Sequence, residues 1–477
     1  MGLVAPVAPV PLGQLGRVHF VGIGGAGMSG IARIMLARGV TVSGSDRAAS
    51  EQLDALAALG AVVHVGHAAE NIAGADTVVT TPSAIGDKNI EVLEAGRRGI
   101  TVIPRAAALA SLMMGRRSIV VTGTHGKTTT TSMLTTVLRH SGADPSYVIG
   151  GILRESGLGA DDGSGVTFVA EADESDGSFL MLSPQAAVVT CIEAEHLDNY
   201  RDLAHIQATF EAFAATIGED GLLVACRDDP GAAALASASA ALPLRVRTYG
   251  ESAGADYRLT GATGRGMTTQ LTVVPPGDGQ PAPVTLTIGV PGRHNALNAT
   301  AVFAAAVELG VPVPAVISGL EAYGGALRRL EPKGEADGVR VLDTYAHHPT
   351  EITADLTAAR DVAAGGRVIA VFQPHLYSRT RFFATEFGAA LALADEALVL
   401  DVYAAREDPE PGITGLTVAA AVPGGGARFV PDAAAVPDII AGLAKPGDLV
   451  LTMGAGDVTT LAPQIVAALR ERTGGRP

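Results

Sequence analysis

The sequence predicts an α/β protein of about three domains, and three observations lead to this prediction. The chain has 477 residues, which is enough for about three domains of roughly 150 residues each. Short apolar runs alternate with helical stretches along most of its length, as in the β-α-β units of a parallel sheet. Two glycine-rich loops each follow a predicted strand and precede a predicted helix, so at least two such units are present.

The first domain is placed at residues 1–111. Strands are expected over 17–23, 40–46 and 75–82, and helices over 27–39 and 51–60. This alternation indicates a parallel sheet with helices on both faces.

The second domain is placed at residues 112–326. Strands are expected over 118–123, 167–173 and 186–193, and helices over 128–142 and 294–310. Between residues 245 and 291, β-forming residues alternate with Gly/Pro turns. That texture indicates antiparallel strands added to the α/β unit.

The third domain, residues 327–477, again alternates strands with helices. Its strands end in polar residues and are expected over 339–347, 366–375, 396–403 and 448–457. Ligands of such sheets bind at the carboxyl ends of the strands. The His, Tyr and Arg side chains that end the first two strands are therefore candidates for a site, and arginine there could bind a carboxylate in bidentate fashion.

Composition narrows the possible partners. The net charge of −15 argues against nucleic acid, because binding phosphates needs a basic face. Cys191 and Cys226 form no C-x-x-C pair and favour a reducing compartment; we interpret Cys191 as a buried small hydrophobic residue within a strand. The N-terminal segment lacks a basic n-region and no run of 18 apolar residues occurs, so we expect a cytoplasmic protein that does not insert into a membrane.

The second loop, "VTGTHGKTTTTSM", has the residues of a triphosphate-binding loop. Gly123 and Gly126 allow the backbone to approach an anion at a helix N-terminus. Lys127 could neutralise the β- and γ-phosphates, and the Thr128 hydroxyl could ligate Mg²⁺. The match to G-x-x-x-x-G-K-[ST] is imperfect because Val121 stands at the first glycine position. The alternative is a Thr-rich turn that only caps a helix.

The first loop, "FVGIGGAGMSGIA", matches the weaker pattern G-x-G-x-x-G at Gly22, Gly24 and Gly27. Asp46 ends the next predicted strand, where a dinucleotide fold keeps its ribose-binding acid. A dehydrogenase loop or a tight strand-to-helix turn would also match. A nucleotide-sugar diphosphate presents the same pyrophosphate and ribose groups as NAD, so this loop could hold a nucleotide-linked substrate.

Acidic residues follow two strands of the middle region. They are Glu171, Asp173, Glu174 and Asp176 after the first, and Glu193, Glu195 and His196 after the second. Hard oxygen ligands suit Mg²⁺, and phosphoryl transfer needs such an ion to neutralise the developing charge. A solvated loop is the alternative for each cluster, and their shared position beside the second loop counts against it.

The motifs "HFVGIGGAGMSGIA", "VTGTHGKTTTTSM", "AEADESDGSFL", "IEAEHLDNY", "GRHNALNA" and "TYAHHPTEI…FQPHLYSRTR" together resemble those of the Mur ligase superfamily over nearly the whole chain. The resemblance implies a Rossmann-like N-terminal domain for a UDP-sugar, a P-loop-type central ATPase domain and a Rossmann-like C-terminal domain for an amino acid. It also implies ATP and Mg²⁺ as cofactors. The implied reaction joins L-alanine to the lactyl carboxylate of UDP-N-acetylmuramate through an acyl phosphate, in the synthesis of peptidoglycan precursors.

The resemblance also implies site residues, position by position. ATP is expected at Gly123, Thr124, Gly126, Lys127, Thr128, Thr129, His294, Asn295, Arg328 and Asp343. The UDP-sugar is expected at Gly24, Gly25, Gly27, Asp46, His67 and Ser83. L-Alanine is expected at Tyr345, His347 and Arg379, and Mg²⁺ at Thr128, Glu171 and His196. Catalysis is expected to depend on Lys127, Glu171, His196, Arg328 and His347.

Three positions depart from the family pattern. Thr344 and Ala346 stand where relatives commonly have Asp and Gly, and Leu376 stands where many have Arg. The departure at Leu376 implies that the alanine carboxylate rests mainly on Arg379.

Three alternative functions remain at this point. A ligase that joins UDP-N-acetylmuramate to a ready-made tripeptide shares the architecture. An NAD-dependent oxidoreductase would use the first loop but leave "GTHGKTTT" unexplained. A non-catalytic nucleotide-sensing module would have no use for the His and Arg residues of the third domain. The expected oligomeric state is a monomer or a weak homodimer.

Overall fold

The computed structural model describes residues 3–81, 88–197, 199–277, 282–405 and 407–474, which form two compact units. The first unit comprises Met1–Thr260, Val273–Val284 and Leu297–Tyr323, and the second comprises Gly261–Thr272, Thr285–Ala296 and Gly324–Pro477. The described residues form three sheets, of five, ten and six strands. The predicted α/β class with three sheet-based domains is confirmed, while the boundaries at residues 111 and 326 stay predictions.

The N-terminal sheet is parallel throughout and has the order β3-β2-β1-β4-β5. Its strands are β1 (Val18–Val21), β2 (Val42–Asp46), β3 (Val62–Val65), β4 (Thr77–Thr80) and β5 (Thr101–Pro104), and its helices are α1 (Ala26–Ala37), α2 (Glu51–Ala58), α4 (Ile90–Arg98) and α5 (Arg105–Met113). β1 lies between β2 and β4, so its carboxyl end, where the first glycine loop begins, is a topological switch point.

The sequence prediction missed β3, an edge strand that exposes Val62 and Val65. Helix α4 has clear end signals. The Asn89 side chain accepts hydrogen bonds from the N–H groups of the first turn, and Gly99, with a φ of 69°, ends the helix.

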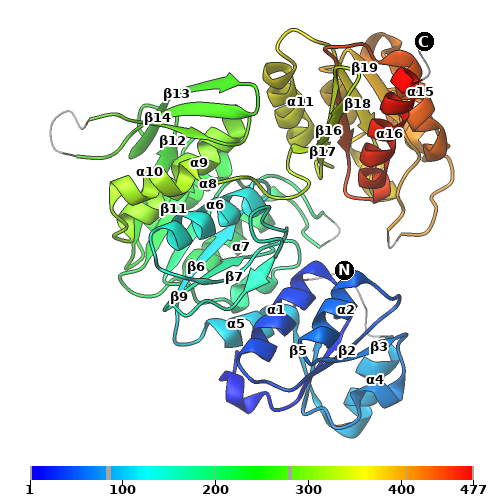
Figure 1. Cartoon of the computed structure of the whole chain (residues 1–477). Helices are drawn as coiled ribbons and strands as arrows, with labels where there is room; N and C mark the ends of the chain where they lie inside the picture. The colour runs from blue at the N-terminus through cyan, green and yellow to red at the C-terminus, as the bar shows by residue number, and fades with distance from the viewer. Residues whose placement is uncertain (1–2, 82–87, 198, 278–281, 406, 475–477) are drawn as a thin grey trace. The chain divides into compact units, whose positions relative to one another are not determined.

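The central sheet has the order β15-β14-β13-β12-β11-β10-β6-β9-β7-β8, and Figure 1 labels several of its strands. Its first strands and helices are β6 (Arg117–Thr122), α6 (Lys127–His140), β7 (Ser146–Val148), β8 (Ala160–Asp161), β9 (Thr167–Glu171), β10 (Ala186–Val189), α7 (Leu203–Ala214), β11 (Leu222–Cys226), α8 (Pro230–Ser239) and β12 (Arg245–Gly250). The strands from β12 to β7 are parallel, and β6 lies between β10 and β9. The carboxyl end of β6 is therefore a second switch point.

The strands predicted after residue 245 are present. They are β13 (Tyr257–Arg265), β14 (Thr268–Val274) and β15 (Val284–Ile288), followed by α9 (Arg293–Glu308) and α10 (Val313–Glu321). Only two residues join β13 to β14, and a connection of this length makes an antiparallel hairpin. The central sheet is therefore mixed, as the Gly/Pro-rich sequence predicts.

The C-terminal sheet has the order β16-β17-β21-β18-β19-β20, with β16 antiparallel to β17 and the other pairs parallel. Its strands are β16 (Glu331–Ala336), β17 (Val339–Thr344), β18 (Val368–Phe372), β19 (Glu396–Val399), β20 (Ala427–Phe429) and β21 (Leu449–Met453). Its helices are α11 (Pro349–Ala363), α12 (Tyr377–Phe382), α13 (Ala384–Leu391), α14 (Gly415–Ala419), α15 (Val436–Leu443) and α16 (Leu461–Gly474).

Alternate residues of the inner C-terminal strands face two different cores. Along β18, Val368, Ala370 and Phe372 pack in the cluster that includes α11, whereas Ile369 and Val371 pack in the cluster of α15 and α16. Figure 1 shows these helices on opposite faces of the sheet. This burial on both faces explains why the strands are continuous apolar runs in the sequence.

Within the described part of the chain, no helix combines the length and the apolar character that crossing a bilayer requires.

Candidate functional site

The second glycine loop links β6 to α6 and needs glycine at both predicted positions. Gly123 and Gly126 have φ values of 124° and 80°, in the region that disfavours side chains. A Cβ on Gly123 would lie 2.3 Å from Oγ1 of Thr190, and one on Gly126 would lie 2.9 Å from Oδ1 of Asn298. The loop therefore brings bare backbone to the N-terminus of α6, as the prediction of an anion-binding loop requires.

Lys127 is the first residue of α6, and its side chain lies along the loop. Its Nζ donates to the carbonyl oxygens of Gly123 (2.7 Å) and Thr124 (3.1 Å) and lies 2.9 Å from Oε2 of Glu174. Burial would lower the pKa of Lys127, but the nearby carboxylates of Glu174 and Asp173 outweigh burial and raise it. The ammonium group therefore stays charged at the mouth of the loop, where a phosphate would compete with Glu174 for it.

Thr128 and Glu171 come from different elements and meet beside Lys127. Oγ1 of Thr128 lies 3.0 Å from Oε1 of Glu171, whose second oxygen accepts a hydrogen bond of 2.7 Å from the Gly150 N–H. Neighbouring oxygens around an octahedral Mg²⁺, with bonds of about 2.1 Å, are roughly 3 Å apart. The pair of oxygens thus fits the magnesium ligation that the sequence predicts for these two residues.

His196 lies near the same group, with a φ of 54° that holds it at a turn. Its Nε2 is 3.7 Å from Oε1 of Glu174 and 3.8 Å from Oε2 of Glu195. Burial lowers the pKa of His196, yet the hydrogen bond to Glu174 and the charge of Glu195 raise it overall. Glu174 and Asp176 are only 2% and 6% exposed, so these two acids do not lie on a solvated loop.

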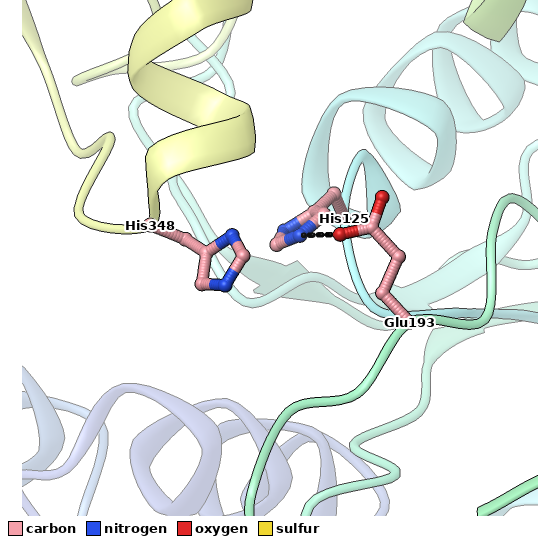
Figure 2. Close-up of side chains that lie close together, drawn as sticks. All are labelled: His125, Glu193 and His348. Carbon is pink, nitrogen blue, oxygen red and sulfur yellow. Dashed lines mark ion pairs between the residues drawn. The ribbon is translucent and has the colours of Figure 1, made fainter. Parts of the chain in front are cut away.

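The interpretation of Cys191 as a strand residue is wrong. β10 ends at Val189, and Sγ of Cys191 accepts a hydrogen bond of 3.2 Å from the N–H of His125 in the glycine loop. His125 also forms an ion pair of 3.4 Å with Glu193, and the two side chains face each other in Figure 2. The Glu193 N–H donates to Oγ1 of Thr124 (2.9 Å). The loop is thus supported by the residues that follow β10.

The first glycine loop has different neighbours. The Gly24 N–H donates to Oδ2 of Asp46 (2.9 Å), and a Cβ on Gly24 would lie 2.9 Å from this oxygen. A Cβ on Gly27 would lie 2.4 Å from Nη1 of Arg105. Arg105 in turn pairs with Asp173, with Nη2 and Oδ2 3.2 Å apart. The structure thus brings Gly24 and Asp46 together and places Gly27 against Arg105; the part of Asp46 in binding ribose stays a prediction.

The other residues predicted for the UDP-sugar lie at the same edge of the sheet, with one exception. Gly25 is the N-cap of α1, and His67 follows the carboxyl end of β3. His67 lies in a buried polar network around Glu91, which the sequence analysis did not single out. Glu91 resembles an ordinary first-turn glutamate in the sequence, and only its burial reveals it. Ser83 lies outside the described residues.

In the second unit, the partly exposed Arg328 pairs with the buried Asp343. Nε of Arg328 is 3.5 Å from Oδ2 of Asp343, and its Nη2 donates to the carbonyl oxygen of Gly454 (2.5 Å). Asp343 is fully buried and accepts hydrogen bonds of 2.7 Å from the hydroxyls of Thr452 and Thr459. In this arrangement Asp343 supports Arg328; its contact with the ATP ribose stays a prediction.

The residues predicted for L-alanine are connected through the ring of His375. The rings of Tyr345 and His347 are 5.2 Å apart, and those of His347 and His375 are 5.9 Å apart. Nδ1 of His375 lies 3.3 Å from Nη1 of Arg379. Tyr403, which the sequence analysis placed at a strand end, follows β19 in a loop and stacks on His375 at 5.8 Å.

The departures from the family pattern have structural consequences. The Thr344 hydroxyl donates to Oδ2 of Asp355 (2.5 Å), whose Oδ1 lies 3.6 Å from Nε2 of His294. Burial raises the pKa of Asp355 to about 7, and burial together with the charge of Arg329 lowers that of His294 to about 4. Near neutral pH, His294 is therefore neutral, whereas Asp355 is close to half protonated. Asp355 carries no motif and was not predicted.

The remaining predicted residues lie close to these groups. Asn295 donates to the carbonyl oxygen of Pro291 (2.7 Å) at the start of α9, and Thr129 is buried in the first turn of α6. Ala346 and Leu376 are 2% and 7% exposed. The buried leucine cannot supply the second cation that an arginine would bring, so Arg379 is the cation next to His375.

Three family models match the chain. They are the Mur ligase family catalytic domain over residues 17–117, the Mur ligase middle domain over 121–306 and the Mur ligase glutamate ligase domain over 328–456. The matched ranges cover the N-terminal sheet and most of the central sheet, with its glycine loop and acidic cluster. They also cover the region from Arg328 to Arg379.

Relatives and solved structures agree with these models. The UDP-N-acetylmuramate–L-alanine ligase of Thermobifida fusca is 55% identical over 98% of this chain and 100% of its own, and that of Acidothermus cellulolyticus is 54% identical over 98% of both. The UDP-N-acetylmuramate–alanine ligase structure of Thermotoga maritima has a TM-score of 0.80 at 29% identity, covering 96% of this chain and 99% of that one. A murein peptide ligase of Psychrobacter arcticus, with a TM-score of 0.70 at 24% identity, covers 95% of this chain and 98% of its own and shows a shared fold. The chain belongs to the Mur ligase family.

Proposed function

We propose that this chain is an ATP-dependent ligase that adds L-alanine to the lactyl carboxylate of UDP-N-acetylmuramate, and that it works in the cytoplasm. The observation that carries the proposal is the 55% identity over 98% of the chain to an enzyme with this activity. The geometry supports it, because a charged lysine and a pair of hard oxygens meet at the loop where a phosphoryl donor would lie.

The proposed chemistry explains why one chain has two glycine loops. A carboxylate is a poor electrophile and does not acylate an amine in water. Attack of a lactyl carboxylate oxygen on the γ-phosphorus of ATP forms an acyl phosphate and releases ADP. The amine of alanine then attacks the acyl carbon, phosphate leaves with the bonding electron pair, and the amine loses a proton. The second loop would hold ATP, the phosphoryl donor. The first loop would hold the nucleotide that carries the lactyl carboxylate.

Residues of the second loop would act by charge and position. Lys127 would bind the β- and γ-phosphate oxygens, and the loop N–H groups would donate hydrogen bonds to the remaining phosphate oxygens. Thr128 and Glu171, with His196 nearby, would hold Mg²⁺, which neutralises charge on the transferring phosphoryl group when bound. Gly123, Thr124, Gly126 and Thr129 would shape the loop around the phosphates.

Residues of the second unit would bind L-alanine and two parts of ATP, the adenine and the γ-phosphate. We propose that Arg379 binds the alanine carboxylate beside Tyr345 and His347, and that His294 and Asn295 bind adenine. Arg328 would bind the γ-phosphate, supported by Asp343. The ring contact between His347 and His375 and the hydrogen-bond distance from His375 to Arg379 support a single alanine site.

The tripeptide ligase is the second candidate. The structural likeness to the Psychrobacter arcticus murein peptide ligase shows the shared fold, but the relatives at 54–55% identity are alanine ligases. Those identities favour alanine as the acceptor.

Phosphate release from ATP and Mg²⁺ tests the proposal. The assay contains UDP-N-acetylmuramate with L-alanine, with the tripeptide or with no acceptor, and mass spectrometry identifies the product. We expect release and a new UDP-N-acetylmuramyl-L-alanine product only with alanine. Turnover with the tripeptide alone would assign the chain to the second candidate, and no turnover with either acceptor would contradict both.

A further inference from the structure

Glu91 is a fully buried carboxylate at the first turn of α4, and hydrogen-bond donors surround it. Its Oε1 accepts from the Ala68 N–H (3.2 Å) and from Nδ2 of Asn71 (2.7 Å). Its Oε2 lies 2.5 Å from the Ser45 hydroxyl and 3.3 Å from Nδ1 of His67. The fully buried ring of His19 is 3.6 Å from the same oxygen.

These contacts keep the carboxylate ionised. Burial would raise the pKa of Glu91, but the nearby His19 ring and hydrogen bonds from Ser45 and Asn71 outweigh burial and lower it to about 2. An ionised carboxylate accepts hydrogen bonds and donates none. Each neighbour of Oε2 must therefore present a proton to it.

The number of available protons then determines which ring nitrogen of His67 is protonated. Ser45 has one hydroxyl proton, and the short contact with Glu91 uses it. Oγ of Ser45 also lies 2.9 Å from Nδ1 of His67 and can only accept in that contact. Nδ1 must therefore carry a proton, and a neutral His67 then has a bare lone pair on Nε2.

His67 stands where the bare nitrogen can meet a ligand. Its side chain is 26% exposed, and it follows β3 at the sheet edge that also holds Asp46 and the first loop. The structure gives Nε2 no hydrogen-bond partner among the described residues. A uridine nucleotide offers hydrogen-bond donors of the right kind, namely the uracil N3–H and the ribose hydroxyls.

We propose that Glu91, by its own contact with Nδ1 and through Ser45, is a positioning residue that holds His67 with its proton on Nδ1, so that Nε2 accepts a hydrogen bond from the uridine part of the nucleotide-sugar. This inference deepens the proposed function and rests on it for the identity of the ligand. The state of the His67 ring itself does not depend on that identity.

Glu91→Gln tests the proposal directly, because it should reverse the direction of the hydrogen bonds that join residue 91, Ser45 and His67. The Ala68 and Asn71 donors will hold the amide oxygen of the new side chain, so its NH₂ group must face Ser45 and His67. The NH₂ then donates to Ser45, whose hydroxyl proton turns toward Nδ1 of His67. The proton of His67 moves to Nε2, which becomes a donor facing the donors of the ligand.

Two control variants accompany it. Ser45→Ala removes the bridging hydroxyl but leaves the carboxylate 3.3 Å from Nδ1, so His67 should keep its proton there. Glu94→Gln makes the same chemical change on the same helix, where Glu94 pairs with Arg97 and Arg98. It should alter neither the ring of His67 nor the kinetics.

The experiment combines ¹⁵N NMR of labelled histidine rings, using His67→Asn to assign the signal, with steady-state kinetics and melting curves. We expect a protonated Nδ1 in the wild type and in Ser45→Ala, and a protonated Nε2 in Glu91→Gln. The KM for the UDP-sugar should rise roughly tenfold in Glu91→Gln, the size expected for a mismatched buried hydrogen bond, while the KM for ATP stays unchanged.

A neutral wild-type His67 with its proton on Nε2 would overturn the inference even if no variant folds. A folded Glu91→Gln variant in which His67 keeps its proton on Nδ1 and the KM for the UDP-sugar is unchanged would also overturn it. Failure of the wild type to turn over UDP-N-acetylmuramate would instead overturn the proposed function, and the NMR result would still decide the state of the ring.

Discussion

The two glycine loops have the same local design but different surroundings. Each follows the strand at a topological switch point and leads into a helix. The second loop has Lys127 as the first residue of its helix, with the oxygens of Thr128 and Glu171 beside it. The first loop has no lysine in its helix, and its glycine N–H is bound to Asp46.

This difference shows that the side chains beside a glycine loop determine its chemistry. A loop of bare backbone can bind a pyrophosphate wherever it precedes a helix. Transfer of a phosphoryl group also needs positive charge placed on the transferring oxygens. On this account the second loop binds and activates its nucleotide, whereas the first only binds.

The largest expected effect comes from removing the charge of the second loop. Lys127→Ala should lower kcat by about a thousandfold or more, because the lost cation acts on the transferring phosphoryl group. It should leave binding of the UDP-sugar unchanged. Measured turnover and UDP-sugar titrations check this, with the exposed Lys445→Ala as the control. Near-normal turnover would mean that the two loops do not differ in the proposed way.

A smaller but more specific effect is expected at the oxygen pair. Glu171→Gln should raise the Mg²⁺ concentration needed for half-maximal activity roughly tenfold or more, because a neutral amide is a weaker ligand for a hard cation. The check is an Mg²⁺ titration of turnover at saturating substrates. An unchanged Mg²⁺ requirement would remove Glu171 from the metal site.

The first loop should respond through binding alone. Gly24→Ala places a Cβ 2.7 Å from the Leu53 side chain and 2.9 Å from Asp46, so the loop must shift. We expect the KM for the UDP-sugar to rise about tenfold with kcat and the KM for ATP almost unchanged. Gly96→Ala is the matched control, since nothing lies within 4 Å of the added carbon. Equal rises in both KM values would contradict the separation of the loops.

A further prediction concerns stability instead of activity, at a carboxylate of the second unit whose pKa is raised. The pKa of Glu91 is lowered to about 2, whereas that of Asp355 is raised to about 7. A carboxyl group whose pKa is higher in the folded state stabilises the fold below its unfolded pKa, and this contribution is lost as pH rises toward 7. Relative to Asp355→Asn, the wild type should lose roughly 2 kcal/mol of unfolding free energy between pH 5 and pH 8.

Denaturant unfolding of both proteins across this pH range checks the last prediction. A difference between them that does not vary with pH would contradict the raised pKa of Asp355.

The sequence predicted well the features that depend on local pattern. The alternating apolar runs indicated most of the parallel strands, and Gly123, Gly126 and Lys127 indicated the phosphate loop because loop and helix are adjacent in the chain. The prediction missed the edge strand β3, and it also missed the interior strand β11, although β11 is apolar and buried throughout.

The sequence could not reveal partnerships between distant segments. Glu91 meets His67, and Asp355 meets both Thr344 and His294, only because the folded chain places them together. Cys191 was misjudged for the same reason, since its contact with His125 depends on how the chain leaves β10. Such contacts are set by tertiary structure and carry no motif.

The most direct test of the account is a crossed binding measurement by calorimetry. Lys127→Ala and Gly24→Ala are each titrated with UDP-N-acetylmuramate and with an ATP analogue and Mg²⁺. We predict that Lys127→Ala weakens the ATP analogue and spares the UDP-sugar, and that Gly24→Ala does the reverse. Weakening of both ligands by each folded variant, or the opposite assignment, would contradict the claim that the two loops hold different substrates.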